Sequence, residues 1–355
     1  MTAVDTPLSV EEVEPIGLGP RDALVRIGAS GLCHSDLLFL AGVGRFPPPM
    51  VLGHEGAGVV AEIGPDVRGL RPGDRVICSW VTACGGCRLC VGGQSHLCDA
   101  LAEAWEEPKL RSAGGAEVRE MLGVGSFAEA AVVDERALVK VETDLPDEQL
   151  ALIGCGVTTG VGAVLNTAAV VPGSTVAVFG CGGVGQSVVQ GARIAGAARI
   201  VAVDPLELKR SAALRLGATD AVDPTEADPV EQIRELTGGR GADYAFDAAG
   251  LEQTIGPAYK SIRRGGTLVL VGIPHPDTRI PWPPVDQILT GKRLLGCLYG
   301  SADVRRDFPR LVELAERGKL DLAAMISRTI SLDEVNEGLD AIERGEVIRS
   351  VIVNY

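Results

Sequence analysis

The 355-residue sequence has comparatively few basic side chains. Lysine and arginine number 33 against 47 aspartates and glutamates, which gives a formal net charge of −14. Such a surface repels phosphate backbones and anionic lipid headgroups, so we expect neither nucleic acid nor a membrane surface as a partner. The N-terminal residues contain no basic segment followed by an apolar core. The sequence therefore predicts no secretory signal, and we expect a cytoplasmic protein.

Charged side chains are missing altogether between residues 149 and 192. A run this apolar could indicate a membrane span, but its many glycines and Pro172 favour the buried strands and tight turns of a globular protein. Internal repeats and low-complexity tracts are also absent from the sequence. The length and the 46% share of apolar residues suit two domains, each with a core of its own.

Three blocks of the chain differ in the spacing of their apolar residues. Residues 1–156 alternate short apolar runs with Gly/Pro turns, which predicts a β-rich domain. Residues 157–298 alternate strand-like and helix-like segments, which is typical of a doubly wound parallel sheet in an α/β fold. Residues 299–355 predict two helices and a last strand, "RSVIVNY".

A glycine motif opens the middle block. The strand-like "TVAVF" leads into Gly180-x-Gly182-x-x-Gly185, and a helix-like segment follows. In that context the glycines indicate a dinucleotide-binding turn, with the diphosphate at the helix N-terminus. The next strand ends in Asp204, which we expect to accept hydrogen bonds from the ribose hydroxyls and to repel a 2′-phosphate. The cofactor is therefore expected to be NAD and not NADP. An acidic helix cap is the alternative role of Asp204, because Pro205 follows it.

Nine cysteines in a chain with no predicted secretion signal favour metal ligands and free thiols over disulfides. Four of them, Cys84, Cys87, Cys90 and Cys98, form a C-x2-C-x2-C-x7-C array. Four thiolates with short spacers predict a closed tetrahedral zinc site with a structural role. An iron–sulfur cluster is the alternative, but the loop lacks the x3-C-P ending of the bacterial clusters.

A second metal site is predicted from three separated turns. Cys33 in "GLCHSD" alone would more often be a buried apolar residue than a ligand. His54 in "VLGHEGAGVV" and Cys155 in "LIGCGVTTG" change that expectation. Two thiolates and one imidazole make a three-ligand zinc site with an open position, which is the arrangement of catalytic zinc in enzymes that oxidise alcohols.

These motifs resemble the zinc-dependent medium-chain alcohol dehydrogenases in identity and order over nearly the whole chain. The similarity rests on "GLCHSD", "GHEGAGVV", the four-cysteine loop 84–98, "GCGVTTG", "GCGGVG" and "RIVAVDPLELKR". It implies a GroES-like catalytic domain over residues 1–156, a Rossmann NAD-binding domain over 157–298, and a return to the catalytic domain over 299–355. It also implies two zinc ions per chain, one nicotinamide cofactor, and a small alcohol or aldehyde as substrate.

Carried over to this sequence, the resemblance implies that Cys33, His54 and Cys155 bind the catalytic zinc and that Ser35 hydrogen-bonds the substrate oxygen. Asp36 and Glu55 would orient the ligands from behind. The other implied residues are His34, Thr159, Gly180, Gly182, Gly183, Val184, Gly185, Asp204, Lys209, Val271 and Arg349 at the cofactor, and Trp80 at the substrate pocket. Leu38 departs from the family, because many members have at that position a histidine that passes the alcohol proton to solvent. The sequence therefore does not assign the route by which the proton reaches solvent.

Two classes of function follow from these observations. The complete ligand set favours a catalytic NAD-dependent oxidoreductase over a dinucleotide-binding protein without catalysis, which would be expected to have lost ligands. Within the enzyme class, the closest likeness is to thiol-adduct (S-hydroxymethyl thiol) formaldehyde dehydrogenases and to nicotinoprotein alcohol dehydrogenases. The strand-like "RLLGCLYG" is predicted at the edge of the parallel sheet, so we expect a homodimer or homotetramer.

Overall fold

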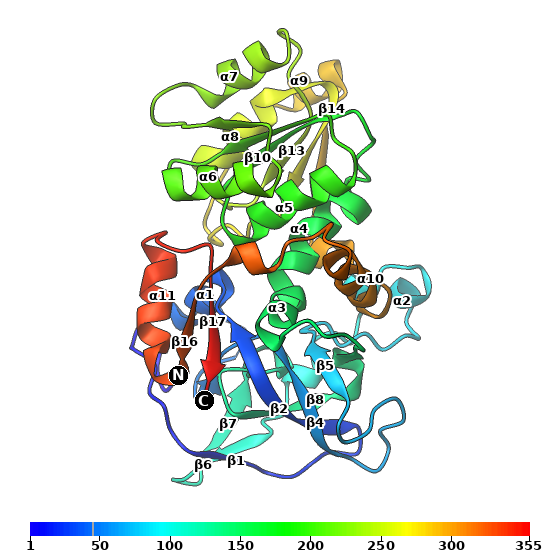
Figure 1. Cartoon of the computed structure of the whole chain (residues 1–355), viewed down its shortest axis with the longest axis vertical. Helices are drawn as coiled ribbons and strands as arrows, with labels where there is room; N and C mark the ends of the chain where they lie inside the picture. Colours follow the sequence, from blue (N-terminus) through cyan, green and yellow to red (C-terminus); the bar gives the residue numbers. More distant parts are fainter. Residues whose placement is uncertain (45) are drawn as a thin grey trace. The chain divides into compact units, whose positions relative to one another are not determined.

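The computed structural model describes residues 1–44 and 46–355 (Figure 1). The chain divides into two compact units. The first comprises Met1–Cys155, Asp303–Gly318 and Ile326–Tyr355, and the second comprises Gly156–Ala302 and Lys319–Met325. The domain boundaries predicted at residues 156 and 298 stay predictions.

The first unit is built on a largely antiparallel sheet, as the β-rich pattern predicts. Its strands follow the order β16-β17-β2-β4-β5-β9, and β8 also pairs with β2. Their bounds are β2 Asp22–Gly31, β4 Glu55–Ile63, β5 Arg75–Cys78, β8 Ala130–Asp134, β9 Leu138–Lys140, β16 Ile326–Ser331 and β17 Arg349–Asn354. In β2, Ala23, Val25 and Ile27 are buried while Arg26 between them is exposed. This alternation directs one face of the strand into the core.

Among the described residues, this unit also contains a smaller sheet and five α-helices. The sheet has the order β1-β6-β7-β3, with β1 Val13–Pro15, β3 Met50–Val51, β6 Leu110–Ser112 and β7 Glu117–Glu120. The helices are α1 His34–Leu40, α2 Arg88–Val91, α3 Asp147–Leu152, α10 Val304–Glu316 and α11 Val335–Glu343. The two helices and the last strand predicted after residue 299 are α10, α11 and β17.

The second unit contains a six-stranded parallel sheet with helices along both faces (Figure 1). The strand order is β12-β11-β10-β13-β14-β15, with β10 Thr175–Phe179, β11 Arg199–Val203, β12 Asp220–Val222, β13 Ala242–Asp247, β14 Ile262–Leu270 and β15 Arg293–Gly296. Its helices include α5 Gly183–Ile194, α6 Glu207–Leu216, α7 Pro229–Leu236, α8 Glu252–Ser261 and α9 Pro284–Thr290. The strand order reverses between β10 and β13. This is the topological switch point of a doubly wound sheet, where such folds bind their ligands. The predicted edge position of β15 is confirmed.

The expectation of buried strands is wrong for the first half of the uncharged run. Residues Asp147–Thr167 are helical, with α4 Thr158–Gly162 between the π-helical turns Ile153–Val157 and Ala163–Thr167. An apolar run alone does not distinguish a buried strand from a buried helix. This helix is long and apolar enough to cross a membrane, but 78% of its most apolar window is buried. It is therefore a core helix.

The glycines of this helix serve packing. A Cβ atom on Gly160 would lie 2.4 Å from the Ser187 Cβ of α5, and one on Gly162 would lie 2.5 Å from the Gly300 carbonyl oxygen. Contacts below 3 Å are not tolerated in a packed interior. The glycines that suggested turns therefore allow other segments to approach α4 closely.

Candidate active site

The predicted ligands Cys33, His54 and Cys155 come together in the first unit. Cys33 lies between β2 and α1, His54 directly precedes β4, and Cys155 lies in the π turn after α3. One ligand atom from each of them, and one from Glu55, all lie within 4.8 Å of one another, and all four residues are buried. Two sulfurs and one imidazole at this spacing fit the ligand set of a zinc ion.

Asp36 contacts two of these ligands, the backbone of Cys33 and the ring of His54. Its carboxylate is fully buried, accepts hydrogen bonds from the backbone N–H of Cys33 (2.8 Å) and Gly53 (3.2 Å), and lies 3.3 Å from His54 Nδ1. His54 Nε2 is buried and has no hydrogen-bond partner among the described residues. The pairing with Asp36 thus leaves Nε2 as the ring nitrogen for a metal ion.

Burial and neighbouring groups shift the pKa values of these ligands in opposite directions. A hydrogen bond with the Cys155 thiol holds the pKa of Cys33 well below its usual value. Burial lowers the pKa of His54, but the Asp36 carboxylate and Cys33 together more than offset this, so the pKa of His54 lies well above its usual value. The centre therefore favours a negative charge on Cys33, which is the form in which a thiol binds metal.

Glu55 forms a buried ion pair with Arg349. Both residues are at most 4% exposed, and Arg349 Nη2 donates to Glu55 Oε1 while Nη1 donates to the Leu32 carbonyl oxygen (2.9 Å). Burial lowers the pKa of Arg349, but the charges of Glu55, Cys33 and Cys155 together outweigh this effect, and the net shift is upward. A Cβ atom on Gly31 would lie 2.2 Å from Glu55 Oε2, so the glycine at this position makes room for the pair. The role of Arg349 at the cofactor phosphates stays a prediction.

The other residues predicted in this unit lie around the same centre or at its surface. Ser35 Oγ lies 3.7 Å from Cys33 Sγ. His34 is the exposed first residue of α1, and Leu38 on the same helix is half-buried. Trp80 follows β5 and packs half-buried against the core of the main sheet. The roles of these residues stay predictions.

The four-cysteine loop brings its sulfurs together as the spacing predicts. One ligand atom from each of Cys84, Cys87, Cys90 and Cys98 lies within 4.8 Å of the others. Backbone N–H groups donate along the loop, from Cys84 to the Cys98 sulfur (3.3 Å) and from Cys87 to the Cys84 sulfur (3.3 Å). Such donors, with the N–H of Gly86 the strongest, lower the pKa of Cys84 to about 6. Four thiolates in this arrangement fit a closed zinc site.

The glycine motif lies where β10 ends and α5 begins. Gly180 has a φ angle of +86°, and a Cβ atom on it would lie 2.9 Å from Ala249 N. A Cβ atom on Gly185 would lie 1.9 Å from the Gly180 carbonyl oxygen. Gly182 differs, because nothing lies within 4 Å of the Cβ position, and Gly183 is the first residue of α5. The open space at Gly182, next to the helix N-terminus, fits a diphosphate.

Asp204 follows β11 and contacts this motif. Its Oδ2 accepts from the Cys181 N–H (2.8 Å), and its Oδ1 accepts from the Leu206 N–H (2.9 Å) just before α6. The carboxylate therefore also has the helix-end contact considered as its alternative role. Arg210, which the sequence analysis did not single out, donates to the Asp204 carbonyl oxygen (2.8 Å). The sequence feature that could have identified Arg210 is its position in the first turns of the helix after "VAVDP".

The remaining predicted cofactor residues lie in the second unit. Thr159 is buried in α4, Val184 is in the first turn of α5, and Val271 directly follows β14. The backbone carbonyl of Lys209 accepts from Gln186 Nε2 (2.9 Å). The contacts of these residues with a nicotinamide cofactor stay predictions.

Comparison with known proteins is consistent with this arrangement. Residues 19–143 match the model of the alcohol dehydrogenase GroES-like domain, and residues 183–317 match that of the zinc-binding dehydrogenases. The NDMA-dependent alcohol dehydrogenase of Amycolatopsis methanolica and the S-(hydroxymethyl)glutathione dehydrogenase of Photobacterium damsela subsp. piscicida are each 39% identical, over 98% of this chain and 96% of theirs.

A solved structure shows the same fold. The alcohol dehydrogenase zinc-binding domain protein from Burkholderia ambifaria superposes with a TM-score of 0.95 at 35% identity, over 100% of this chain and 97% of that one. Taken with the two metal centres and the glycine motif, these similarities show that the chain belongs to the zinc-binding medium-chain alcohol dehydrogenase family and is an oxidoreductase of that type.

Proposed function

We propose that this protein transfers hydride between an alcohol or aldehyde and NAD, with the substrate oxygen at the centre formed by Cys33, His54 and Cys155. The observation that carries the proposal is the convergence of these three ligands, buried and within 4.8 Å, with Glu55 beside them. Arg349 pairs with Glu55. Because Glu55 already has Arg349 as a charged partner, we assign the fourth ligand position to the substrate and not to Glu55, although a Glu55 oxygen lies within 4.8 Å of the ligand atoms.

The chain's own residues then have distinct tasks in the proposed reaction. When bound, zinc supplies Lewis acidity toward the substrate oxygen, and the nicotinamide accepts or gives the hydride. Asp36 fixes the orientation of His54 and of the Cys33 backbone. The Ser35 hydroxyl, next to the Cys33 sulfur, accepts the substrate hydroxyl proton in a hydrogen bond. Asp204 binds the adenosine ribose.

Two finer alternatives are favoured by the names of the similar proteins. One is dehydrogenation of an S-hydroxymethyl thiol, and the other is an NDMA-dependent alcohol oxidation. For the second, the resemblance to nicotinoprotein alcohol dehydrogenases implies a nicotinamide that stays bound. A dinucleotide-binding protein without catalysis is disfavoured because the whole ligand set is present.

Turnover assays with the zinc-loaded protein separate these possibilities. NADH formation from primary alcohols and added NAD, without thiol, supports the main proposal. NADH formation only from formaldehyde plus a low-molecular-weight thiol supports the first alternative. Nicotinamide released only on denaturation, with turnover that needs an added acceptor and not NAD, supports the second. Absence of turnover under all three conditions would contradict the proposed function.

The NAD preference is tested by Asp204→Ser. Removal of the carboxylate removes its repulsion of a 2′-phosphate, so we expect the NADP/NAD ratio of kcat/KM to rise by about tenfold or more. Asp277→Ser is the matched control, because Asp277 is an exposed aspartate of the same unit. A wild-type enzyme equally active with NAD and NADP would contradict the assigned role of Asp204.

A further inference from the structure

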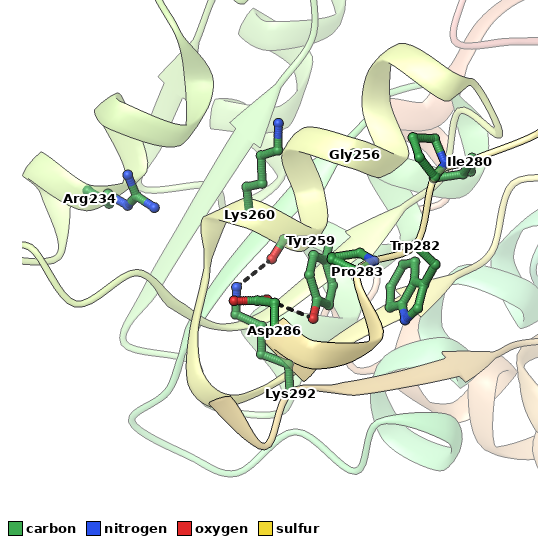
Figure 2. A pocket seen from close by; sticks show the side chains of 10 residues that line it. Arg234, Gly256, Tyr259, Lys260, Ile280, Trp282, Pro283, Asp286 and Lys292 are labelled. Atoms are coloured by element: carbon green, nitrogen blue, oxygen red, sulfur yellow. Dashed lines mark hydrogen bonds between the residues drawn. The ribbon is translucent and has the colours of Figure 1, made fainter. Parts of the chain in front are cut away.

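A cavity of about 340 Å³ lies in the second unit among α7, α8, α9 and the start of β15 (Figure 2). Tyr259 is near the end of α8, just before β14, and Lys292 directly precedes β15. The cavity is therefore at the amino ends of these parallel strands, whereas the glycine motif follows the carboxyl end of β10. Strands of about five residues place these two edges roughly 17 Å apart. The cavity is thus separate from the proposed cofactor site.

Two aromatic rings form one wall of the cavity. The rings of Tyr259 and Trp282 are 4.4 Å apart between centroids and tilted by 57°. Tyr259 donates its hydroxyl proton to Asp286 Oδ2 (3.0 Å), and Trp282 Nε1 donates to Gln287 Oε1 (2.7 Å). These bonds fix both rings and occupy their polar atoms. Trp282 remains only half-buried, so its ring can stack with a planar ligand.

Cationic groups outnumber anionic ones around the cavity. Lys292 Nζ donates to the Tyr259 carbonyl oxygen (3.1 Å) and lies 4.5 Å from the centroid of that ring. An ammonium has three donors, so two are not used by the Tyr259 carbonyl, although the Asp286 charge also acts on Lys292. Lys260 has no hydrogen bond or ion pair with any residue in the described part of the chain, and its ammonium points away from Asp286 (Figure 2). Asp286 is the carboxylate of the lining, and Arg234 is paired with Glu231 at 2.6 Å.

We propose that this cavity binds a small aromatic carboxylate, with the ring against Trp282 and the carboxylate on Lys292. Its volume is at the lower end of the range for small-molecule sites, which suits a single-ring ligand. Lys260 is a further cationic residue of the lining. The inference does not depend on the proposed reaction, because none of these residues belongs to a metal centre or to the glycine motif.

Calorimetric titration of the zinc-loaded protein with sodium benzoate tests the proposal. We expect saturable binding with a millimolar or lower dissociation constant. Benzamide has the ring without the charge, acetate has the charge without the ring, and both should bind about tenfold more weakly or worse. Saturating NAD should leave the benzoate affinity unchanged, because the cavity and the glycine motif lie at opposite sheet edges.

Substitutions then assign the binding to this cavity. Trp282→Ala and Lys292→Met should each weaken benzoate binding by about tenfold or more, whereas Trp282→Phe should retain most of it. Lys319→Met, which removes an exposed lysine of the same unit outside the cavity, is the control and should have no effect. Equal benzoate affinity in all these proteins, or the same loss in the control, would overturn the proposal. So would the lack of saturable binding in a wild-type protein whose thermal unfolding is cooperative.

Discussion

At the scale of single residues, the segment Gly31–Asp36 shows how one short stretch supports a buried centre. Gly31 leaves room for Glu55, Leu32 supplies a carbonyl to Arg349, and Cys33 offers its sulfur. Asp36 then contacts His54 and the Cys33 backbone. Buried charges persist only when they are paired or hydrogen-bonded. The polar residues of this stretch are therefore tolerated in the interior because they pair and hydrogen-bond with one another and with their buried neighbours.

Leu38 leads to a prediction about proton release. Its helix neighbours Leu37, Phe39 and Leu40 pack against the cluster around Met50 and Leu339, but Leu38 is not part of that cluster. Leu38→His should therefore fold normally. An imidazole there can relay a proton near neutral pH, so we expect alcohol oxidation at pH 7 to rise by about tenfold.

The measurement is the pH dependence of kcat with one primary alcohol and saturating NAD. Leu38→Asn is the matched control, because it is polar but does not titrate in this range. Superimposable profiles of wild type and Leu38→His would show that this position does not take part in a relay.

Glu120 leads to a prediction about stability. It is 4% exposed, its Oε2 accepts from the Lys109 N–H (3.4 Å), and its Oε1 has no partner among the described residues. Burial raises the pKa of Glu120 from 4.5 to about 7. The unfolded chain ionises at the lower pH, so the folded state loses stability as the pH rises from 4.5 through 7.

Glu120→Gln removes this loss because glutamine does not ionise. Relative to wild type, the variant should gain about 3 kcal/mol in unfolding free energy between pH 4 and pH 8. Urea unfolding at both pH values measures the difference, and Glu117→Gln, an exposed position on the same strand, serves as control. A pH-independent difference between Glu120→Gln and wild type would contradict the burial argument.

At the scale of elements, the two metal centres are assembled differently. The four-cysteine site is formed within one loop of 15 residues, where N–H groups of the loop itself donate to the sulfurs. The three-ligand site needs β2, β4 and the helix after α3 to come together. The first can therefore stabilise its own loop on metal binding, whereas the second depends on the surrounding fold.

Metal analysis should find about two zinc ions per chain, and a chelator should remove one of them first. The retained ion is expected in the four-cysteine site, because four thiolates leave no coordination position open to a competing ligand. Iron with a visible absorption spectrum, or a single zinc in fully loaded protein, would contradict the assignment.

Two cysteine variants distinguish the centres. Cys87→Ser should lower the melting temperature by about 5 °C or more, because the loop loses its metal. Cys155→Ser should abolish turnover and leave the melting temperature nearly unchanged. Calorimetry and activity measured on the same preparations provide the test, and the opposite pattern would reverse the two roles.

At the scale of the whole molecule, an exposed apolar surface adjoins the edge of the parallel sheet. Strand β15 is the edge strand, and on the preceding helix α9 Val285, Ile288 and Leu289 are 68%, 78% and 67% exposed. An edge strand beside exposed apolar side chains favours pairing with a second copy. We therefore predict at least a homodimer.

Ile288→Glu should weaken this association by about tenfold or more, because it places a charge in the apolar contact. Val171→Glu is the control, since Val171 is 57% exposed in the same unit and outside α9. Light scattering across a dilution series gives the dissociation constants. A wild-type protein that is monomeric at every concentration would refute the prediction.

The sequence by itself determined the features whose geometry is local. The four-cysteine loop, the turn around Gly180 and the position of Asp204 after β11 follow from short spacings, because neighbouring residues have few ways to arrange themselves. The order of the motifs also indicated the family, and the alternating blocks predicted a β-rich unit and a parallel sheet. These predictions did not require knowledge of distant contacts.

Only the tertiary structure decided what depends on residues far apart in the chain. It paired Glu55 with Arg349 across 294 positions, made residues 147–167 a buried helix, and placed Tyr259 beside Trp282. A hydrophobic pattern indicates that a segment is buried, but it does not indicate which segment packs against it. A charged residue in the sequence likewise does not indicate its ion-pair partner. Long-range packing supplies both, because burial free energy and ion pairing act between surfaces that only the fold brings together.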